Sequence, residues 1–249
     1  MELRQLTTDH ERQIFAKCLA EARATRGFGF REAPGSMLAQ VHIQFGSLYA
    51  LFEDVGAPAE QMQGGFIIHT LKSFPQTHPK PDLSHIDPRY VLEGGELWSL
   101  SRGMGKIAHH VAAAMAGLLQ AKAIIVYPIV EPDDLTTRHL QLGFVPCSEK
   151  VKWPYVEAVD GREVWIQPLL LQGERLDRYI GAGFDFLFHA NAGRGPILTF
   201  DKAIASAGPR RPAQAPVTLD KVQVDEKVLG AAQLSSANGT EERNGAGAR

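Results

Sequence analysis

The chain has 249 residues, of which 44% are hydrophobic, and a formal net charge of −2. This length fits one large domain with additions, and the near-neutral charge excludes a long-range electrostatic pull toward nucleic acid or anionic lipid. Apolar stretches such as 123–130 are far shorter than the roughly 20 residues that a membrane-spanning helix needs. We therefore expect no nucleic-acid partner and no membrane span.

The start of the chain and its cysteines indicate the cellular compartment. Charged residues follow Met1 closely, without the apolar segment of a secretory signal peptide. Cys18 and Cys147 lie far apart and outside any CxxC spacing, so we expect neither a disulfide framework nor a zinc site. These features predict a cytoplasmic protein.

The residue pattern predicts strands and helices in a defined order. We expect a strand at 3–6, a helix that starts at a capping box of Thr8 and Glu11, strands at 42–52, 65–74 and 90–100, a buried alanine-rich helix at 107–120, a strand at 123–130, a short helix at 133–142 ending at Gly143, and a hairpin of strands 151–159 and 163–171 around Asp160-Gly161. The strand–helix–strand unit in the middle favours parallel pairing, and the other strands favour antiparallel pairing. The fold class is therefore α/β (α+β), with a mixed, mostly antiparallel central sheet flanked by helices.

The composition divides the chain into three parts. We expect a folded domain at 1–172, an extension at 173–204 that packs on it, and a disordered tail at 205–249. After Phe200 there is no aromatic residue, so the tail cannot bury enough apolar surface to offset the entropy of ordering. In the extension, the aromatic run Phe184-Asp-Phe-Leu-Phe188 is expected to close a pocket or to form an oligomer contact.

A glycine-containing loop between a strand and the buried helix is the sharpest chemical feature. It reads Ser101-Arg-Gly-Met-Gly-Lys-Ile107. Its two glycines allow consecutive amide groups to point to one site, where the helix start adds positive partial charge. We expect this loop to bind a pyrophosphate through Leu100, Arg102, Gly103, Met104, Gly105 and Lys106. The alternative is an ordinary strand-to-helix turn.

The loop also fits a dinucleotide fingerprint. Gly103-x-Gly105-x-x-Ala108 has the required spacing, and Glu131 follows about where a ribose-binding carboxylate is found. A nicotinamide-dependent oxidoreductase is therefore one alternative. Such a domain continues with further strand–helix–strand units, whereas this chain continues with one short helix and a hairpin.

Two motifs resemble the GNAT acyltransferase superfamily. Arg102-Gly-Met-Gly105 resembles its R/Q-x-x-G-x-G/A loop, and His139-Leu-Gln-Leu-Gly-Phe144 resembles its Y-x-x-x-G-F signature. The resemblance covers roughly 1–172 and implies direct transfer of an acyl group from acyl-CoA to a small-molecule amine, without a metal. It also implies that the pantetheine of CoA runs between the fourth and fifth strands. Pro128 fits this place, because a proline lacks a ladder donor and belongs where two strands part.

A narrower resemblance concerns the fourth strand. Trp98-Ser-Leu-Ser-Arg102 resembles the W-E-x-S-R strand of acyl-homoserine-lactone synthases and long-chain N-acyl amino acid synthases. It implies that acyl carrier protein is a further candidate donor. Ser99 replaces the glutamate of that motif, and the N-terminal Arg/Phe/Trp pattern of lactone synthases is not evident, so lactone formation is not expected. Ile107 and His139 depart from the wider pattern, which leaves a non-catalytic acyl-CoA-binding module as a second alternative.

Glu96 and His139 are the candidates for proton transfer. Strand alternation puts Glu96 on the face opposite Glu93, and we expect Glu96 to deprotonate the amine. His139 takes the tyrosine position of the resemblance, and an imidazolium with a reference pKa of about 6.5 can protonate the departing thiolate. The alternatives are a solvated strand carboxylate and a surface helix residue. The neighbouring His109 and His110 cannot face one metal together, and no metal site is expected.

Overall fold

The computed structural model describes residues 1–25, 30–33, 38–70, 81–101, 103–189, 192 and 199–200. Its helices are α1 (Asp9–Thr25), α2 (Leu38–Phe45), α3 (Met104–Leu118), α4 (Thr137–Gln141) and α5 (Glu174–His189). Its strands are β1 (Glu2–Leu6), β2 (Phe30–Glu32), β3 (Ser47–Phe52), β4 (Met62–Thr70), β5 (Val91–Ser99), β6 (Ala123–Val126), β7 (Ile129–Glu131), β8 (Val145–Pro146), β9 (Val151–Ala158), β10 (Glu163–Ile166), β11 (Leu169–Gln172) and β12 (Thr199–Phe200). The predicted tail at 205–249 lies outside the described residues.

The strands of the described residues form a large sheet in the order β12-β1-β3-β4-β5-β6-β11-β8 and a smaller one in the order β2-β9-β10-β7. In the large sheet, β5 pairs in parallel with β6, and β1 with β12, while the remaining pairs are antiparallel. The predicted mixed, mostly antiparallel sheet flanked by helices is therefore confirmed. The predicted parallel strand–helix–strand unit is β5-α3-β6.

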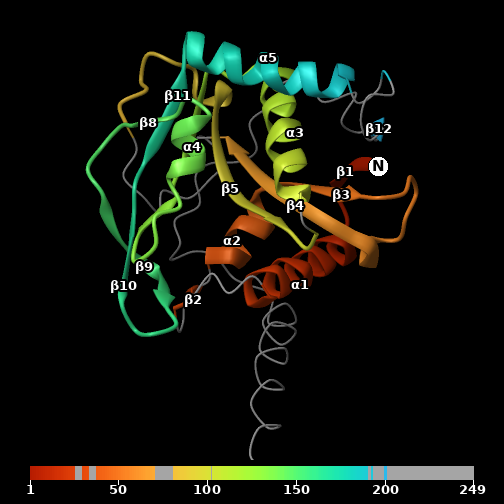
Figure 1. Ribbon diagram of the computed structural model, residues 1–249, viewed down its shortest axis with the longest axis horizontal. Helices are drawn as coiled ribbons and strands as arrows, with labels where there is room; N and C mark the ends of the chain where they lie inside the picture. Colours follow the sequence, from red (N-terminus) through yellow and green to blue (C-terminus); the bar gives the residue numbers. More distant parts are fainter. Residues whose placement is uncertain are drawn as a thin grey trace, which may run out of the picture.

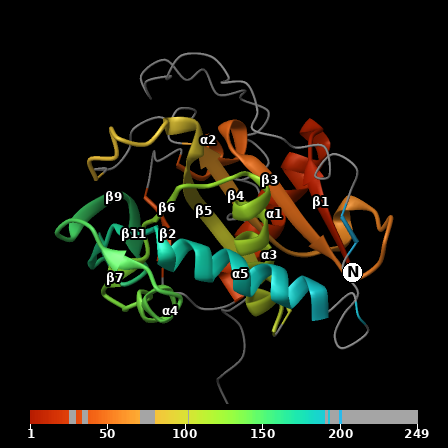
Figure 2. The ribbon, with the colours of Figure 1, turned by 90° about the horizontal axis from the view of Figure 1, so that it is seen from above.

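Helices cover both faces of the large sheet. Figures 1 and 2 show α3 and α5 on one face and α1 and α2 on the other. Each face has its own apolar core: Phe66, Leu92 and Met115 belong to the layer under α3, and Phe15 and Trp98 belong to the layer under α1. The central strands are buried on both sides because both layers pack against them.

Several short motifs predict the local structure correctly. The capping box at the start of α1 is present, since the Thr8 amide donates to the Glu11 carboxylate at 3.0 Å and the Glu11 amide donates to the Thr8 hydroxyl at 3.2 Å. Gly143 follows α4 with a φ of 96°, which is the left-handed conformation that ends helices. Gly161 has a φ of 82° in the turn that joins β9 to β10.

The predicted strand at 42–52 is wrong over its first half. Residues 42–45 belong to α2, and only Ser47–Phe52 forms a strand. The apolar residues Leu38, Val41 and Phe45 recur at helical spacing, and the amide of Gly46 donates to the His42 carbonyl at 2.9 Å, which closes the last turn.

Three other boundaries also differ from expectation. The buried helix begins at Met104 instead of 107, and the short helix covers only Thr137–Gln141. The carboxylate of Asp134 accepts from the Thr136 amide at 2.8 Å and from its hydroxyl at 2.6 Å, so the preceding residues form a turn. The run 163–171 divides at Gln167 and Pro168 into β10 and β11, which lie in different sheets.

The segment after 172 contributes α5, which packs closely against α3. A Cβ on Gly183 would lie 2.5 Å from the Ala114 amide nitrogen and 2.8 Å from the His110 carbonyl oxygen. A Cβ on Gly117 would lie 2.6 Å from the Phe184 ring. Gly183 of α5 and Gly117 of α3 therefore each lie at the contact between the two helices, where the absence of a side chain lets the helices pack closely. Within the described ranges, each helix is too short or too polar to cross a membrane.

Candidate functional site

The site begins where β5 and β6 part. The two strands pair in parallel at Val91 with Ala123, Leu92 with Ile124 and Glu93 with Ile125. Beyond Glu93, β5 continues to Ser99, whereas β6 ends at Val126 and the chain passes through Pro128 into β7 of the other sheet. Pro128 thus lies at the separation of the two strands, as predicted, and beyond that point no strand among the described residues pairs with β5 on the side of β6.

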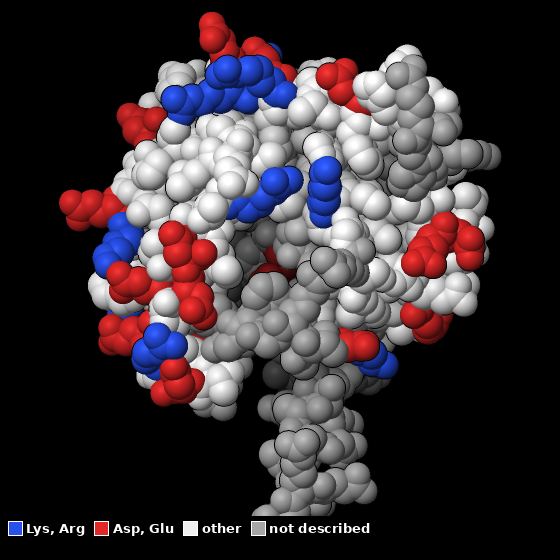
Figure 3. All heavy atoms as spheres, in the orientation of Figure 1, with Lys and Arg blue, Asp and Glu red and all other residues white. Residues whose placement is uncertain are grey.

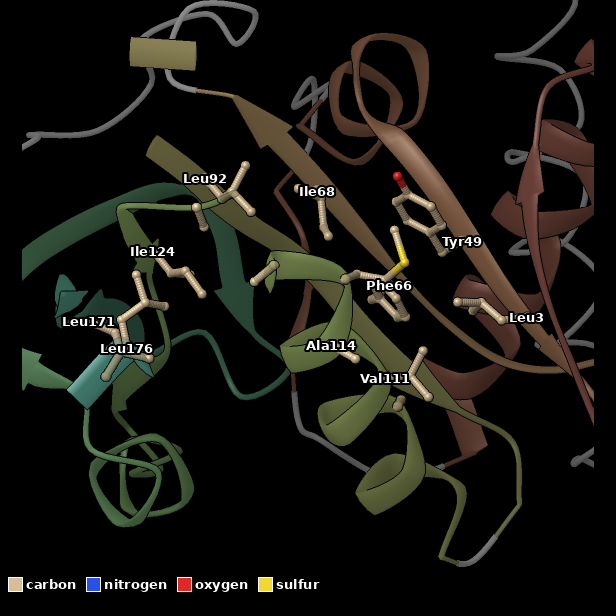
Figure 4. Packing of buried hydrophobic residues seen from close by; sticks show 14 of the residues in the cluster. Leu3, Tyr49, Phe66, Ile68, Leu92, Val111, Ala114, Ile124, Leu171 and Leu176 are labelled. Carbon is tan, nitrogen blue, oxygen red and sulfur yellow. The ribbon is translucent and has the colours of Figure 1, made fainter. Parts of the chain in front are cut away.

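An apolar cavity of about 80 Å³ lies where the two strands separate, on the α3 side of the sheet. It is lined by Phe66, Ile67, Ile68, Leu92, Gly94, Gly95, Leu97, His109, Ala112, Ala116, Ile124, Val126, His139, Phe144 and Tyr179. Figure 4 shows Phe66, Ile68, Leu92 and Ile124 on the side of the sheet that carries α3. The predicted extension takes part in the cavity through Tyr179, whose hydroxyl donates to the His109 carbonyl at 3.3 Å.

Two glycines let the β5 backbone border this cavity directly. A Cβ on Gly94 would lie 3.0 Å from Val126, and a Cβ on Gly95 would lie 2.9 Å from Nδ1 of His42. The register between β4 and β5 shifts here, because Phe66 faces Leu97 while Ile68 faces Gly94. Gly95 and Glu96 therefore stand opposite a single residue of β4, which is a β-bulge.

The bulge sets the direction of the two candidate carboxylates. Glu96 forms an ion pair with Arg23 of α1 and is not among the residues that line the cavity. Glu93 is a register partner of Ile125, which belongs to the apolar cluster on the side away from α3. The expectation that Glu93 and Glu96 lie on opposite faces is therefore wrong, because the extra residue in the strand restores them to one face.

His139 lines the cavity together with His109, which the sequence analysis considered only as a metal ligand. Their ring centroids are 5.8 Å apart. Burial lowers the pKa of His139 below its ordinary value of 6.5. Burial, assisted by the charges of His139 and Arg138, lowers the pKa of His109 to about 4. Both shifts favour the neutral imidazole, and the expected role of His139 as the acid that protonates the thiolate stays a prediction.

The hydrogen bond of His139 indicates which ring nitrogen is basic. Its Nδ1 lies 3.4 Å from the carbonyl oxygen of Leu135. A carbonyl oxygen only accepts, so this contact assigns the proton of the neutral ring to Nδ1 and leaves the lone pair on Nε2. His139 is thus arranged to accept a proton through Nε2.

A second histidine pair lies on the other face of β5. His42 Nδ1 and His69 Nε2 are 3.1 Å apart, and both side chains are buried. Burial lowers the pKa of His42 to about 4, although the carboxylate of Glu96 opposes this shift. The pair lies directly behind Gly95. The sequence did not reveal it, because His42 was assigned to a strand.

The loop before α3 turns at Gly103, in a left-handed conformation that glycine adopts readily. Gly103 has a φ of 87° and caps α3, and its carbonyl accepts from the Lys106 amide at 3.1 Å. Gly105 lies in the first helical turn, where a Cβ would meet only Ser99 Oγ, at 3.5 Å. Leu100 is anchored to β4 by its amide, which donates to the Gln63 carbonyl at 2.8 Å. Arg102 lies outside the described residues.

Exposed positive charges lie on α3, α4 and α5. Lys106 on α3, Arg138 on α4 and Arg175 and Arg178 on α5 are exposed. Lys106 and Arg138 both lower the pKa of His110 electrostatically, after the effect of its burial. Figure 3 shows Lys and Arg side chains over α5 and above a hollow near the middle of this face, with an Asp or Glu side chain inside the hollow. This arrangement suits an anionic ligand.

Within the described residues, Lys106, Arg138, Arg175 and Arg178 make no ion pair, and neither do the exposed Lys17 and Lys122. Ion pairs are made by the cations at the following positions: Arg4, Arg23, Arg89, Lys150, Lys152 and Arg162. No cluster of three or more His, Cys, Asp and Glu side chains in the described ranges is placed to hold a metal ion.

Comparison with known proteins gives a likeness of fold. No protein-family model and no curated protein matches this chain. Among solved structures, a CoA-dependent acyl-homoserine lactone synthase, BjaI, with SAM and isopentyl-CoA is 12% identical, with a TM-score of 0.45 over 82% of this chain and 96% of that one. A Bacillus subtilis acetyltransferase in complex with CoA is 13% identical, with a TM-score of 0.41 over 69% and 98%.

A GNAT family acetyltransferase from Elizabethkingia anophelis with acetyl-CoA bound is 12% identical, with a TM-score of 0.40 over 57% of this chain and 86% of that one. At these identities and TM-scores the likeness is one of fold.

Proposed function

We propose that this protein is an acyl-CoA-dependent N-acyltransferase that transfers an acyl group directly to the amine of a small-molecule acceptor. The observation that carries this proposal is the apolar cavity between the parted strands β5 and β6, beside the start of α3. Acyl-CoA has phosphates at one end, which suit the start of α3. Its other end is a narrow arm that carries the thioester, and this arm suits the gap between β5 and β6.

The residues around the loop suit the phosphates of CoA. The left-handed Gly103 turns the chain into α3, whose first amides and dipole favour an anion. Lys106 and Arg138 add full charges that make no ion pair elsewhere in the described ranges, and charge-assisted hydrogen bonds to phosphate are the strong ones. An acyl carrier protein, whose phosphopantetheine carries the same chemistry, is a second candidate donor.

The open edge of β5 suits the pantetheine arm. This arm contains amide groups, which can pair with a strand edge as an added strand does. Gly94 and Gly95 border the cavity with backbone only, so an arm can lie close to the strand. A backbone amide of the same open segment is the group we propose for the oxyanion of the tetrahedral intermediate.

The chemistry requires one proton to leave the amine and one to reach the thiolate. The amine attacks the thioester carbonyl, a carbon–nitrogen bond forms, and the carbon–sulfur bond breaks. Neutral His139, with Nε2 basic, accepts the amine proton and passes it to the leaving sulfur, so that no net proton is consumed. Glu96, beside Arg23 on the other face, remains the predicted group for deprotonating an acceptor that binds as an ammonium ion.

The geometry favours this function over the two alternatives. A nicotinamide domain repeats parallel units, whereas the large sheet is mostly antiparallel, and Glu131 lies in the smaller sheet in an ion pair with Lys150. A non-catalytic acyl-CoA-binding module would share the cavity and is distinguished by turnover. The free cysteines Cys18 and Cys147 fit the cytoplasmic location that we propose.

The test is titration calorimetry of CoA, NADH and NADPH against the wild type, Arg102→Ala, Gly103→Val and Gly105→Ala. We expect CoA alone to bind. Gly103→Val should abolish binding, because a β-branched residue is barred from a positive φ, and Arg102→Ala should weaken it roughly tenfold to a hundredfold. Gly105→Ala separates folding from phosphate contact, since its helical position has room for a methyl group within the protein: we expect this variant to fold normally and to bind CoA more weakly. Binding of NADH without CoA would refute the proposal.

A further inference from the structure

Helix α5 has an outer face that the described part of the chain leaves exposed. Leu176 and Leu187 are buried in the core that α5 shares with α3. At about 3.6 residues per turn, the face opposite to them carries Arg178, Gly181 and Asp185. Figure 1 shows α5 along one edge of the molecule, outside α3. The outer face of α5, defined by these three residues and the side chains beside them, is therefore open to a partner.

The aromatic run of α5 is divided between the core and this outer face. The ring of Phe186 stacks on His110 of α3, with the ring centroids 4.7 Å apart. Phe184 and Phe188 are instead 41% and 66% exposed. Residues four apart in a helix are neighbours on its surface, so these two rings form one apolar patch at the edge of the outer face. A single exposed apolar side chain is common, whereas a contiguous patch favours a surface that a partner covers.

Gly181 is a glycine that the packing of one chain does not require. A Cβ at this position would meet nothing within 4 Å, whereas a Cβ on Gly183 would lie 2.5 Å from the amide nitrogen of Ala114. Glycine is unfavourable inside a helix, so its presence at an open position calls for a reason outside the chain. Together with Ala182, it leaves the middle of the outer face low, where a second helix can come close.

The charges on the outer face match those of a second copy of the same helix. Arg178 and Asp185 are exposed and make no ion pair within the described ranges. They are two helical turns apart, about 10 Å, which is too far for them to pair with each other. They lie equally far on either side of the midpoint between Gly181 and Ala182. A copy that runs antiparallel across this midpoint therefore brings its Asp185 to Arg178 and its Arg178 to Asp185, whereas a parallel copy would bring like charges together.

We propose that the outer face of α5 is the interface of a homodimer, in which the two α5 helices pack antiparallel about a two-fold axis at the midpoint between Gly181 and Ala182. A two-fold axis puts the same patch of each copy in contact. It also keeps the phenyl rings of both copies on one side of the contact and the charged pairs on the other. This inference is independent of the proposed acyl-CoA site.

The length of α5 sets the expected strength of the dimer. The helix has 16 residues, which corresponds to about 24 Å. A contact made by one helix from each chain is small among specific interfaces. We therefore expect the dimer to dissociate in the micromolar range.

The experiment measures the mass of the full chain by sedimentation equilibrium, without CoA, at concentrations from about 1 to 200 µM. The variants are Phe188→Asp, Arg178→Asp, Asp185→Arg and the double variant R178D/D185R. The controls are Val159→Asp and Lys122→Asp, which make the same kinds of change at exposed positions outside α5.

The wild type and both controls should rise from the mass of one chain to that of two. Phe188→Asp should remain at one chain, because it places a charge in the apolar patch. Each single charge reversal should weaken dimerisation more than tenfold, since symmetry creates two contacts between like charges in every dimer. The double variant exchanges the two charges and should restore the dimer.

A wild type that keeps the mass of one chain over the whole range would overturn the inference. A dimer that survives Phe188→Asp and both single reversals would overturn it too, because its interface would then lie elsewhere. If the double variant does not recover, the antiparallel pairing is wrong. Circular dichroism checks that each variant folds, and the charge exchange decides the question if Phe188→Asp does not fold.

Discussion

The packing of α5 on α3 leads us to expect opposite changes in stability when each of two glycines of α5 is replaced by alanine. A methyl group on Gly183 would lie 2.5 Å from the backbone nitrogen of Ala114, and backbone cannot rotate away. A methyl group on Gly181 would have no neighbour within 4 Å. The two positions are two residues apart in α5, so Gly183→Ala and Gly181→Ala differ mainly in what the new methyl group meets.

The magnitudes follow from packing and helix propensity. Overpacking costs about 1–3 kcal/mol, and the contacts at Gly183 belong to the upper part of this range because they involve backbone. Replacing glycine by alanine in a helix stabilises the helix by roughly 1 kcal/mol, because alanine has the higher helix propensity. Gly183→Ala should therefore destabilise the fold by about 1–2 kcal/mol, while Gly181→Ala should stabilise it by up to about 1 kcal/mol.

Thermal unfolding is the assay, since a change of 1 kcal/mol moves the melting temperature by roughly 2–4 °C in a protein of this size. We expect Gly183→Ala to lower the melting temperature and Gly181→Ala to raise it. The first change should also weaken CoA binding, because Tyr179 lines the cavity from α5. A shift of the same sign and size in both variants would show that α5 does not pack on α3 at Gly183.

The remaining predictions concern the site. His139→Ala should lower turnover about a hundredfold or more without changing donor affinity, and His189→Ala, on the exposed end of α5, should change neither. Because burial lowers the pKa of His139 below 6.5 and the neutral ring is the working form, the rate should stay level near neutral pH. It should fall only as the pH drops through that lowered pKa; a midpoint above 6.5 would contradict this assignment. Arg138→Glu should weaken CoA binding, most strongly at low salt, whereas Arg162→Glu, which breaks an exposed ion pair with Asp160, should not. Glu96→Gln should lower turnover with an ammonium acceptor, and unchanged rates would return Glu96 to a structural partner of Arg23.

Local signals in the sequence predicted local structure well. The capping box of Thr8 and Glu11, the stop at Gly143 and the turn at Gly161 each depend on a few neighbouring residues. Such features follow from backbone geometry and short hydrogen bonds, so the chain carries their signal within a few positions. The mixed sheet was predicted from the order of the strand and helix patterns, although that order did not include α2.

Features set by distant contacts were harder to predict. His42 was placed in a strand because the run to Phe52 is apolar, and a short apolar run does not distinguish a strand from a buried helix. The cavity draws His109, His139 and Tyr179 from three different helices. Their meeting depends on how α3, α4 and α5 pack, and periodicity along one helix does not contain that information.

The two candidate carboxylates show how a single extra residue changes the site. Strict alternation along a strand separates Glu93 from Glu96, and the bulge at Gly95 and Glu96 reverses this result. Adjacent glycines inside a strand pattern are a known signal for a bulge or a close approach of another backbone, and Gly94-Gly95 stands between the two carboxylates in the sequence. Gly94 and Gly95, which turn Glu96 away from the cavity, also line that cavity with backbone atoms alone. The bulge therefore moves a carboxylate away from the place where a thioester would lie and exposes strand amides there instead.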